Sequence, residues 1–142
     1  MPNLSKNINV VRVVNAQAAG LTAFTGTHVD MQGYDSVIFI AGLGALTATQ
    51  VTSLQAQNGS LVNDTDQANI TNAITAAMAD GDSNKLLILE VFRPLLRYVR
   101  PVINRATANA VIDFCIAIQF SGDKLPPTLD ASVSKYLATI GV

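Results

Sequence analysis

Polar and apolar positions alternate most regularly between Val111 and Phe120. One set of alternate positions is large and apolar: Ile112, Phe114, Ile116, Ile118 and Phe120. The set between them is smaller or polar: Asp113, Cys115, Ala117 and Gln119. Because successive side chains of a strand point to opposite faces, this alternation predicts a β-strand with one apolar face.

Two other segments are apolar at nearly every position, namely Ser36 to Leu43 (SVIFIAGL) and Leu86 to Phe92 (LLILEVF). Continuous runs of this length predict strands that are covered on both faces. β-Branched residues predict a first strand from Ile8 to Ala18. The segment from Gln50 to Asn58 alternates less cleanly and ends in an Asn-Gly turn signal.

Two segments give conflicting signals. Tyr98 to Thr107 alternates like a strand, but Pro101 within it indicates an edge position or a bulge. Residues 69 to 79 place apolar side chains four apart, as in a helix, while their threonines favour a strand. Helix and strand both stay open there, and the β-rich surroundings favour the strand.

Turn signals such as Gln32-Gly33 and Asp80-Gly81-Asp82 recur at the spacing of an all-β protein. We therefore predict a single-domain antiparallel β-sandwich over residues 1–122. Residues 123–142 contain Pro126-Pro127 and form an extended C-terminal arm or a short helix. Because this arm has apolar residues but no core of its own, we expect it to pack on the domain or on a neighbouring subunit.

Composition narrows the function classes. The 142 residues suit one domain, with 49% apolar residues, only 13% charged residues and a net charge of −1. A chain that is not basic is not expected to bind nucleic acid non-specifically, and its apolar runs are too short for a membrane-spanning helix. No signal peptide is visible in the first ten residues. Since near-neutral surfaces tend to associate, the composition favours a protein that is covered by its own copies or by a partner.

Residues that carry catalytic or metal chemistry are scarce: the chain has one His, one Cys and one Glu. His28 lies two residues before Asp30 but lacks a recognisable nucleophile, and Cys115 fits a packing thiol in a strand. The acidic loops at 63–66 and 80–82 have oxygen ligands for Ca²⁺ but not the EF-hand pattern. We therefore predict a protein that is not an enzyme and has no catalytic residue, no metal site and no cofactor.

Four of the five arginines fall within Lys85–Phe120, which is otherwise β-rich. Together with two leucines of the arm, they are the candidate contacts to a partner or subunit: Arg93, Arg97, Arg100, Arg105, Leu125 and Leu129. Glu90 lies in an apolar run and needs a partner if it is buried. Glu90 and Asp113 are therefore candidate internal ion-pair partners of the arginines. Internal salt bridges and contacts to an outside partner both stay open.

Three stretches carry a resemblance to a known group of proteins: DMQGYDSVIFIAGLG, VTSLQAQNG and KLLILEVFRPLLRYVRPVINRATANAVIDFCIAIQFSG. They resemble small virion proteins that tailed bacteriophages encode among their head genes, in particular capsid decoration (cement) proteins. The resemblance rests on the strand and turn pattern and on the phrases Arg-Pro-x-x-Arg-Tyr-Val-Arg and Ala-Asn-Ala-Val-Ile-Asp. It runs from about Val29 to Gly122 and leaves the C-terminal arm outside.

This resemblance implies a jelly-roll-like sandwich that forms a homotrimer and binds the major capsid protein. It also implies synthesis in the bacterial host cytoplasm and a place on the outer capsid surface of the virion. The arginines and the arm from Leu125 would then contact the capsid or a sister subunit. Two other readings stay open: another virion component, of the tail tube or of head completion, and a glycan-binding sandwich on the virion.

Overall fold

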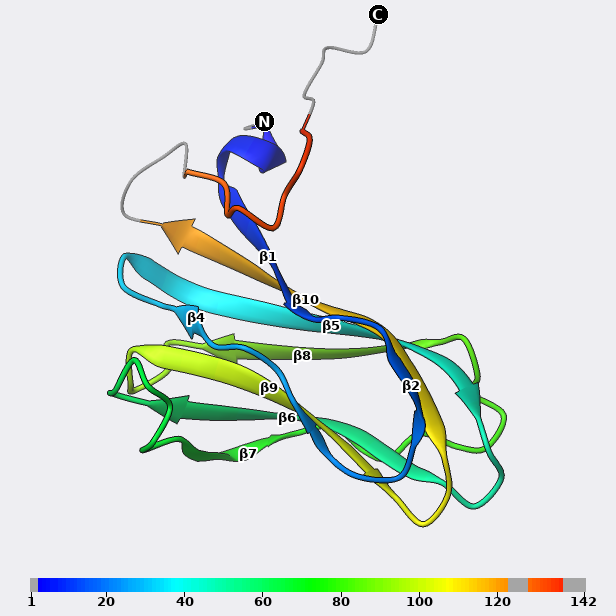
Figure 1. Cartoon of the computed structure of the whole chain (residues 1–142). Helices are drawn as coiled ribbons and strands as arrows, with labels where there is room; N and C mark the ends of the chain where they lie inside the picture. Colours follow the sequence, from blue (N-terminus) through cyan, green and yellow to red (C-terminus); the bar gives the residue numbers. More distant parts are fainter. Residues whose placement is uncertain (1–2, 123–127, 137–142) are drawn as a thin grey trace, which may run out of the picture.

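A computed structural model describes residues 3–122 and 128–136 of the chain. Ten strands form two antiparallel sheets that pack face to face (Figure 1). Sheet A contains β1 (Ile8–Val14), β2 (Gln17–Gly20), β5 (Tyr34–Leu46), β8 (Leu86–Phe92) and β10 (Ala110–Gly122). Sheet B contains β3 (Phe24–Thr25), β4 (Val29–Asp30), β6 (Val51–Gly59), β7 (Ala68–Ile74) and β9 (Tyr98–Ala106).

The order of the strands in sheet A is β1-β10-β5-β8, with β2 also on β10. Sheet B has the order β3-β9-β6-β7, with β4 also on β9. The predicted all-β antiparallel sandwich is therefore confirmed. The helix of the described residues is the three-residue 3-10 helix η1 (Leu4–Lys6), and no helix among these residues is long and apolar enough to cross a membrane.

The core lies between the two sheets and is built from aliphatic side chains with few aromatics. Its largest fully buried apolar side chains come from both sheets: Phe39, Leu43, Leu54, Ile103 and Ile112. The long strands β5, β6, β8, β9 and β10 contribute alternate residues to this layer, as is usual for pleated strands. The two sheets are thus held together mainly by burial of apolar surface.

A bulge in β10 reverses the predicted assignment of its two faces. Ile112 pairs with Leu43, but Phe114 pairs with the next residue of β5, Gly42, so Asp113 is an extra residue on β10. Beyond this bulge, Cys115, Ala117 and Gln119 point into the core. The large apolar side chains of Phe114, Ile116, Ile118 and Phe120 therefore lie on the outer face, where they are half-buried.

The two continuous apolar runs form β5 and β8, but the prediction that both are covered on both faces is wrong. β8 is an edge strand of sheet A, and alternate residues of it are exposed on the outer face. The exposed fractions of Leu86, Ile88 and Phe92 are 55%, 53% and 66%. On β5, Ile38 and Ile40 are half-buried on the same outer face.

The two segments with conflicting signals are both strands. Residues 68–74 form β7, which agrees with the favoured reading. Pro101 does not mark an edge strand, because β9 lies between β6 and the short strands β3 and β4. The carbonyl of Pro101 accepts a hydrogen bond from the N–H of Gly26, which lies between β3 and β4. Pro101 has no N–H to donate, and it lies where the pairing of β9 with these two short strands is interrupted.

The described part of the C-terminal arm, residues 128–136, has no regular secondary structure and packs on its own domain. Ser132 Oγ accepts a hydrogen bond from the backbone N–H of Arg12, and Asn9 Oδ1 accepts one from the N–H of Asp130. The hydroxyl groups of Tyr136 and Ser5 form a hydrogen bond of 2.9 Å. The arm therefore lies along β1, and Figure 1 shows it beside η1 above the layer of sheet A.

Candidate interaction surfaces

Among the described residues, the most exposed large apolar side chain lies at one end of the sandwich, in the connection between β8 and β9. We call residues 92–97 the tip. Leu95 is 95% exposed and Phe92 is 66% exposed. Arg93 opens the loop with a left-handed backbone (φ 49°), and its N–H donates to the carbonyl of Asp35 at 2.8 Å. The backbone bond holds the loop on β5 while its leucine points into solvent.

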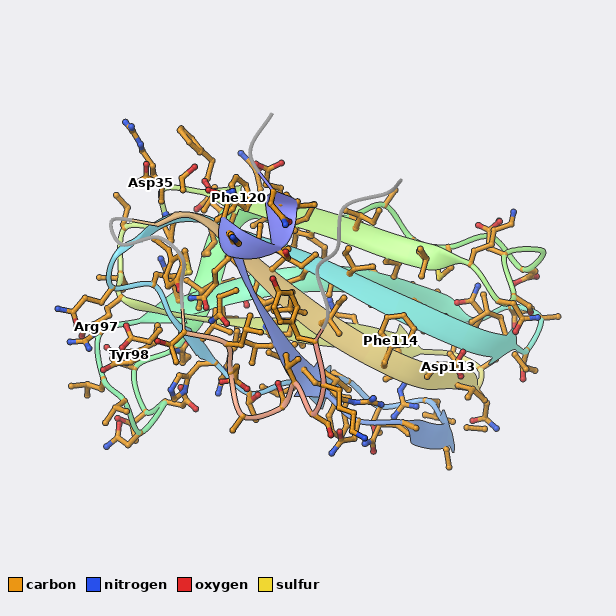
Figure 2. All side chains as sticks on the ribbon, turned by 90° about the horizontal axis from the view of Figure 1, so that it is seen from above. Asp35, Arg97, Tyr98, Asp113, Phe114 and Phe120 are labelled. Carbon is orange, nitrogen blue, oxygen red and sulfur yellow. The ribbon has the colours of Figure 1, made fainter. Side chains whose placement is uncertain are left out.

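Two arginines of the tip lie on either side of its leucines in the sequence. The Arg93 guanidinium lies 5.1 Å from the centre of the Phe92 ring and forms no ion pair within the described residues. Arg97 binds Asp30 through two hydrogen bonds of 2.8 Å each and lies 5.2 Å from the ring centre of Tyr98. The hydrogen bond from Arg97 lowers the pKa of Asp30 below its ordinary value. Figure 2 shows Asp35, Arg97 and Tyr98 at this end of the sandwich.

Hollows lie on both sides of the tip. One of about 450 Å³ is bounded by the loop, by Met31 and by Tyr34. A second, of about 360 Å³, lies between the loop and Ile70 on β7. The tip therefore forms a raised apolar knob with depressions beside it, which is a shape that can interlock with another protein surface.

The acidic loops use their carboxylates to hold their own backbone. Asp66 accepts hydrogen bonds from the N–H of Ser60 at 2.7 Å and of Leu61 at 3.1 Å. Asp82 accepts from the N–H of Ala79 and from Lys85 Nζ. His28 contacts Asp64 at 2.7 Å and the Tyr98 ring, rather than Asp30. Within the described residues, no three side chains of His, Cys, Asp or Glu come together as metal ligands.

The outer face of sheet B carries a lattice of polar side chains. Gln57 accepts a hydrogen bond from Arg100 Nε at 2.9 Å and donates to Asn69 at 2.8 Å. Asn104 donates to Ser53 and to Gln55 at 3.3 Å each. This is the pattern of a sheet that faces water. Arg100, a candidate contact, is half-buried within this lattice.

The outer face of sheet A is apolar over four adjacent strands. Its two central strands contribute six large apolar side chains: Ile38, Ile40, Phe114, Ile116, Ile118 and Phe120. The edge strands add Ile8 and Val10 from β1 and the exposed leucine, isoleucine and phenylalanine of β8. Figure 2 looks onto this face and shows the ring of Phe114 on it. Gly42 is required beneath that ring, because a Cβ atom there would collide with it.

Arg105 is buried inside the sandwich and is not exposed as the predicted contact would require. Its side chain is buried (8% exposed), and Nε donates to the carbonyl of Thr22 at 2.9 Å. Nη1 donates to the carbonyls of Ala18 at 3.1 Å and Ala110 at 2.8 Å. The guanidinium of this β9 residue thus joins β2 and the β2–β3 connection to β10. The alternation of the strand places Arg105 on the inner face, but the sequence contains no sign of its three carbonyl partners.

The predicted internal ion pairs of Glu90 and Asp113 are also wrong. Glu90 is exposed on the outer face of β8, because the segment is an edge strand with one free face. Asp113 is exposed at the bulge of β10. The ion pairs formed within residues 3–122 and 128–136 are His28–Asp64, Lys85–Asp82 and Arg97–Asp30.

A buried amide pair, which the sequence did not point to, links the arm to the tip. Asn9 Nδ2 donates to Gln119 Oε1 at 2.8 Å, and Gln119 Nε2 donates to the carbonyl of Asp30 at 2.6 Å. Asn9 Oδ1 accepts from the N–H of Asp130 in the arm. Hydrogen bonds therefore run from the arm through the core to Asp30, whose carboxylate holds Arg97. Of the two arm leucines that the sequence singles out, Leu129 is half-buried and Leu125 lies outside the described residues.

The sole cysteine is buried in the core face of β10, and this burial raises the pKa of the Cys115 thiol to about 12. We expect a thiol reagent at pH 8 to label the folded protein at least about 100-fold more slowly than the urea-unfolded chain, because the thiolate is the reactive form. Spectroscopic measurement of the labelling rate in both states tests this. Equal rates would show that β10 opens readily.

Comparisons with known proteins do not assign a function to the chain. The sequence matches no protein-family model and no curated protein.

Proposed function

We propose that this chain is a structural protein of a tailed-bacteriophage virion that decorates the outer surface of the capsid and stabilises the head. The resemblance between Val29 and Gly122 supports the virion class. The tip carries the proposal: a leucine that is 95% exposed stands between two arginines and beside two hollows. In this proposal the protein is made in the host cytoplasm. Its tip then binds the major capsid protein.

The tip has the features of an interface anchor. Apolar side chains that enter a pocket of the partner dominate binding energy, and flanking charges contribute orientation and rate. Arg93 forms no ion pair in the described structure, so it is available to a carboxylate of the capsid. A rigid sandwich behind the loop keeps the tip preorganised, which lowers the entropic cost of docking.

Such a protein needs no active site. It acts by occupying many equivalent positions on the capsid lattice. When one bound molecule makes several contacts with the lattice, contacts of modest strength together give tight binding. The polar outer face of sheet B would then face the solvent.

Co-sedimentation with capsids that lack the protein tests the proposal. We expect the wild-type chain to saturate the shells and Leu95→Asp to weaken binding at least about 100-fold, since a buried carboxylate would replace an apolar anchor. Arg93→Glu is expected to weaken binding about tenfold and to make it less sensitive to salt. Val51→Asp, at an exposed position of β6 far from the tip along the strand, is the matched control and should bind normally.

Two results would contradict the proposal. A wild-type protein that stays in the supernatant, or that sediments with tails and not with heads, would remove the decoration role. Equal saturation by wild type and Leu95→Asp would remove the tip from the contact.

A further inference from the structure

The two outer faces of this sandwich differ in a way that solvent exposure does not explain. Sheet B faces outward with hydrogen-bonded Gln, Asn, Ser and Arg side chains. Sheet A faces outward with Ile, Leu, Val and Phe on four neighbouring strands. We propose that a second copy of this chain covers the outer face of sheet A, so that two sandwiches pack through their A sheets about a two-fold axis. This pair differs from the homotrimer that the resemblance implies. The inference goes beyond the decoration role and does not depend on it.

The size of the face suits such a pair. β1 has three outward residues, and β5, β8 and β10 have four each, at spacings of about 6.8 Å. With strands about 4.8 Å apart, the face covers at most roughly 19 Å by 27 Å, or about 500 Å² per copy. A monomer rarely exposes more than a few hundred Å² of contiguous apolar surface. Two such faces together bury about 1,000 Å², which is the lower limit for a specific interface.

The charges on the face select one orientation. Among the described residues of this face, the charged side chains are Arg12 on β1 and Glu90 on β8, which lie at opposite edges, and Asp113, which lies at the bulge of β10 beside Gly44. Arg12 shares a row with Ile116, and Glu90 belongs to the next row, with Ile38. A two-fold axis parallel to the strands lays β1 of each copy over β8 of the other. Each Arg12 then faces a Glu90 one row away, about 7 Å along the strand and within reach of an arginine side chain.

The other in-plane orientation is disfavoured. A two-fold axis perpendicular to the strands would lay β1 over β1 and β8 over β8. Arg12 would then approach Arg12 and Glu90 would approach Glu90 in an apolar interface, where like charges are costly. The pairing of opposite charges therefore requires the parallel axis.

The parallel axis also has a structural consequence for the tip. Because it leaves the strand direction unchanged, both tips lie at the same end of the pair. The arm and η1, which stand above sheet A at β1 (Figure 1), would flank the partner's β8, beyond which sheet A has no further strand. One pair would thus present two tips to a single surface, and two linked contacts bind more tightly than one.

Measurement of the mass in solution without capsids tests this inference. We expect wild type to have twice the 15.0 kDa mass of the chain. Ile118→Lys, at the centre of the outer face of sheet A, should raise the dissociation constant at least about 100-fold, because the interface would bury a lone ammonium. The matched control is Gln55→Lys on the outer face of sheet B, which should remain dimeric. Leu95→Asp should also remain dimeric, so that failure of pairing and failure of capsid docking can be told apart.

Charge reversal tests the orientation in a protein whose apolar face is intact. Arg12→Glu and Glu90→Arg should each weaken the pair about tenfold, because each variant changes both symmetric contacts. The double variant should return to within about threefold of wild type. The backbone bond from Arg12 to Ser132 is kept in all of these variants. A wild-type mass of one or three chains, an Ile118→Lys dimer as tight as wild type, or a double variant no tighter than the singles would overturn the inference.

Discussion

Replacement of Arg105 by alanine is expected to lower the free energy of unfolding by about 3 kcal/mol, since it removes three hydrogen bonds from a charged donor and leaves their acceptors unpaired. The side chain is buried and spans the carbonyls of Ala18, Thr22 and Ala110. Arg105→Lys should also destabilise, by about 2 kcal/mol, because an ammonium cannot reproduce the fork geometry of a guanidinium. Urea unfolding followed by circular dichroism measures both losses.

The matched control for Arg105 is another arginine of the same strand. Arg100 lies on the outer face of β9 and donates to Gln57, so Arg100→Ala should cost less than about 1 kcal/mol. A small loss for Arg105→Ala together with a loss of capsid binding would contradict the structural role. It would instead restore Arg105 as a contact residue.

The second large effect is expected at Gln119. We expect Gln119→Leu to destabilise the fold by about 2 kcal/mol, because the buried Asn9 amide and the Asp30 carbonyl both lose their partners. Leucine keeps most of the volume, so the loss reports on hydrogen bonds more than on a cavity. Urea unfolding measures the change, and Gln55→Leu on the outer face of sheet B should change stability by less than about 0.5 kcal/mol.

Hydrogen exchange gives this variant a second readout. Since Asn9 Oδ1 accepts the N–H of Asp130, a free Asn9 side chain should loosen the described part of the arm. The amide of Asp130 is expected to exchange faster in Gln119→Leu than in wild type. Unchanged exchange at Asp130 would show that the arm is held independently of the core amides.

The fold was largely predictable because its strands depend on local patterns. β-Branched and apolar runs, separated by Gly, Asn and Asp turns, indicated the sandwich and most of its strands. The direction of the strand faces was not predictable, since a single bulge at Asp113 exchanges the two faces of β10. A sequence in which the outer face is as apolar as the core gives no sign of which face is inside.

The candidate site was predicted less well than the fold. Arginines along the chain look alike, yet Arg93 and Arg97 belong to an exposed loop, Arg100 to a polar lattice and Arg105 to the interior. Their roles depend on carbonyl and carboxylate partners that are distant in sequence. Glu90 illustrates the same limit, because its exposure follows from the position of β8 at the sheet edge and not from the apolar run around it.

The most direct test of the decoration role is hydrogen–deuterium exchange of the wild-type protein, free and bound to capsids that lack it. The proposed function predicts that capsid binding protects residues 92–97 and the adjoining residues of the hollows, while the outer face of sheet B exchanges as in the free protein. Protection confined to sheet B, or no difference between the two samples, would contradict it.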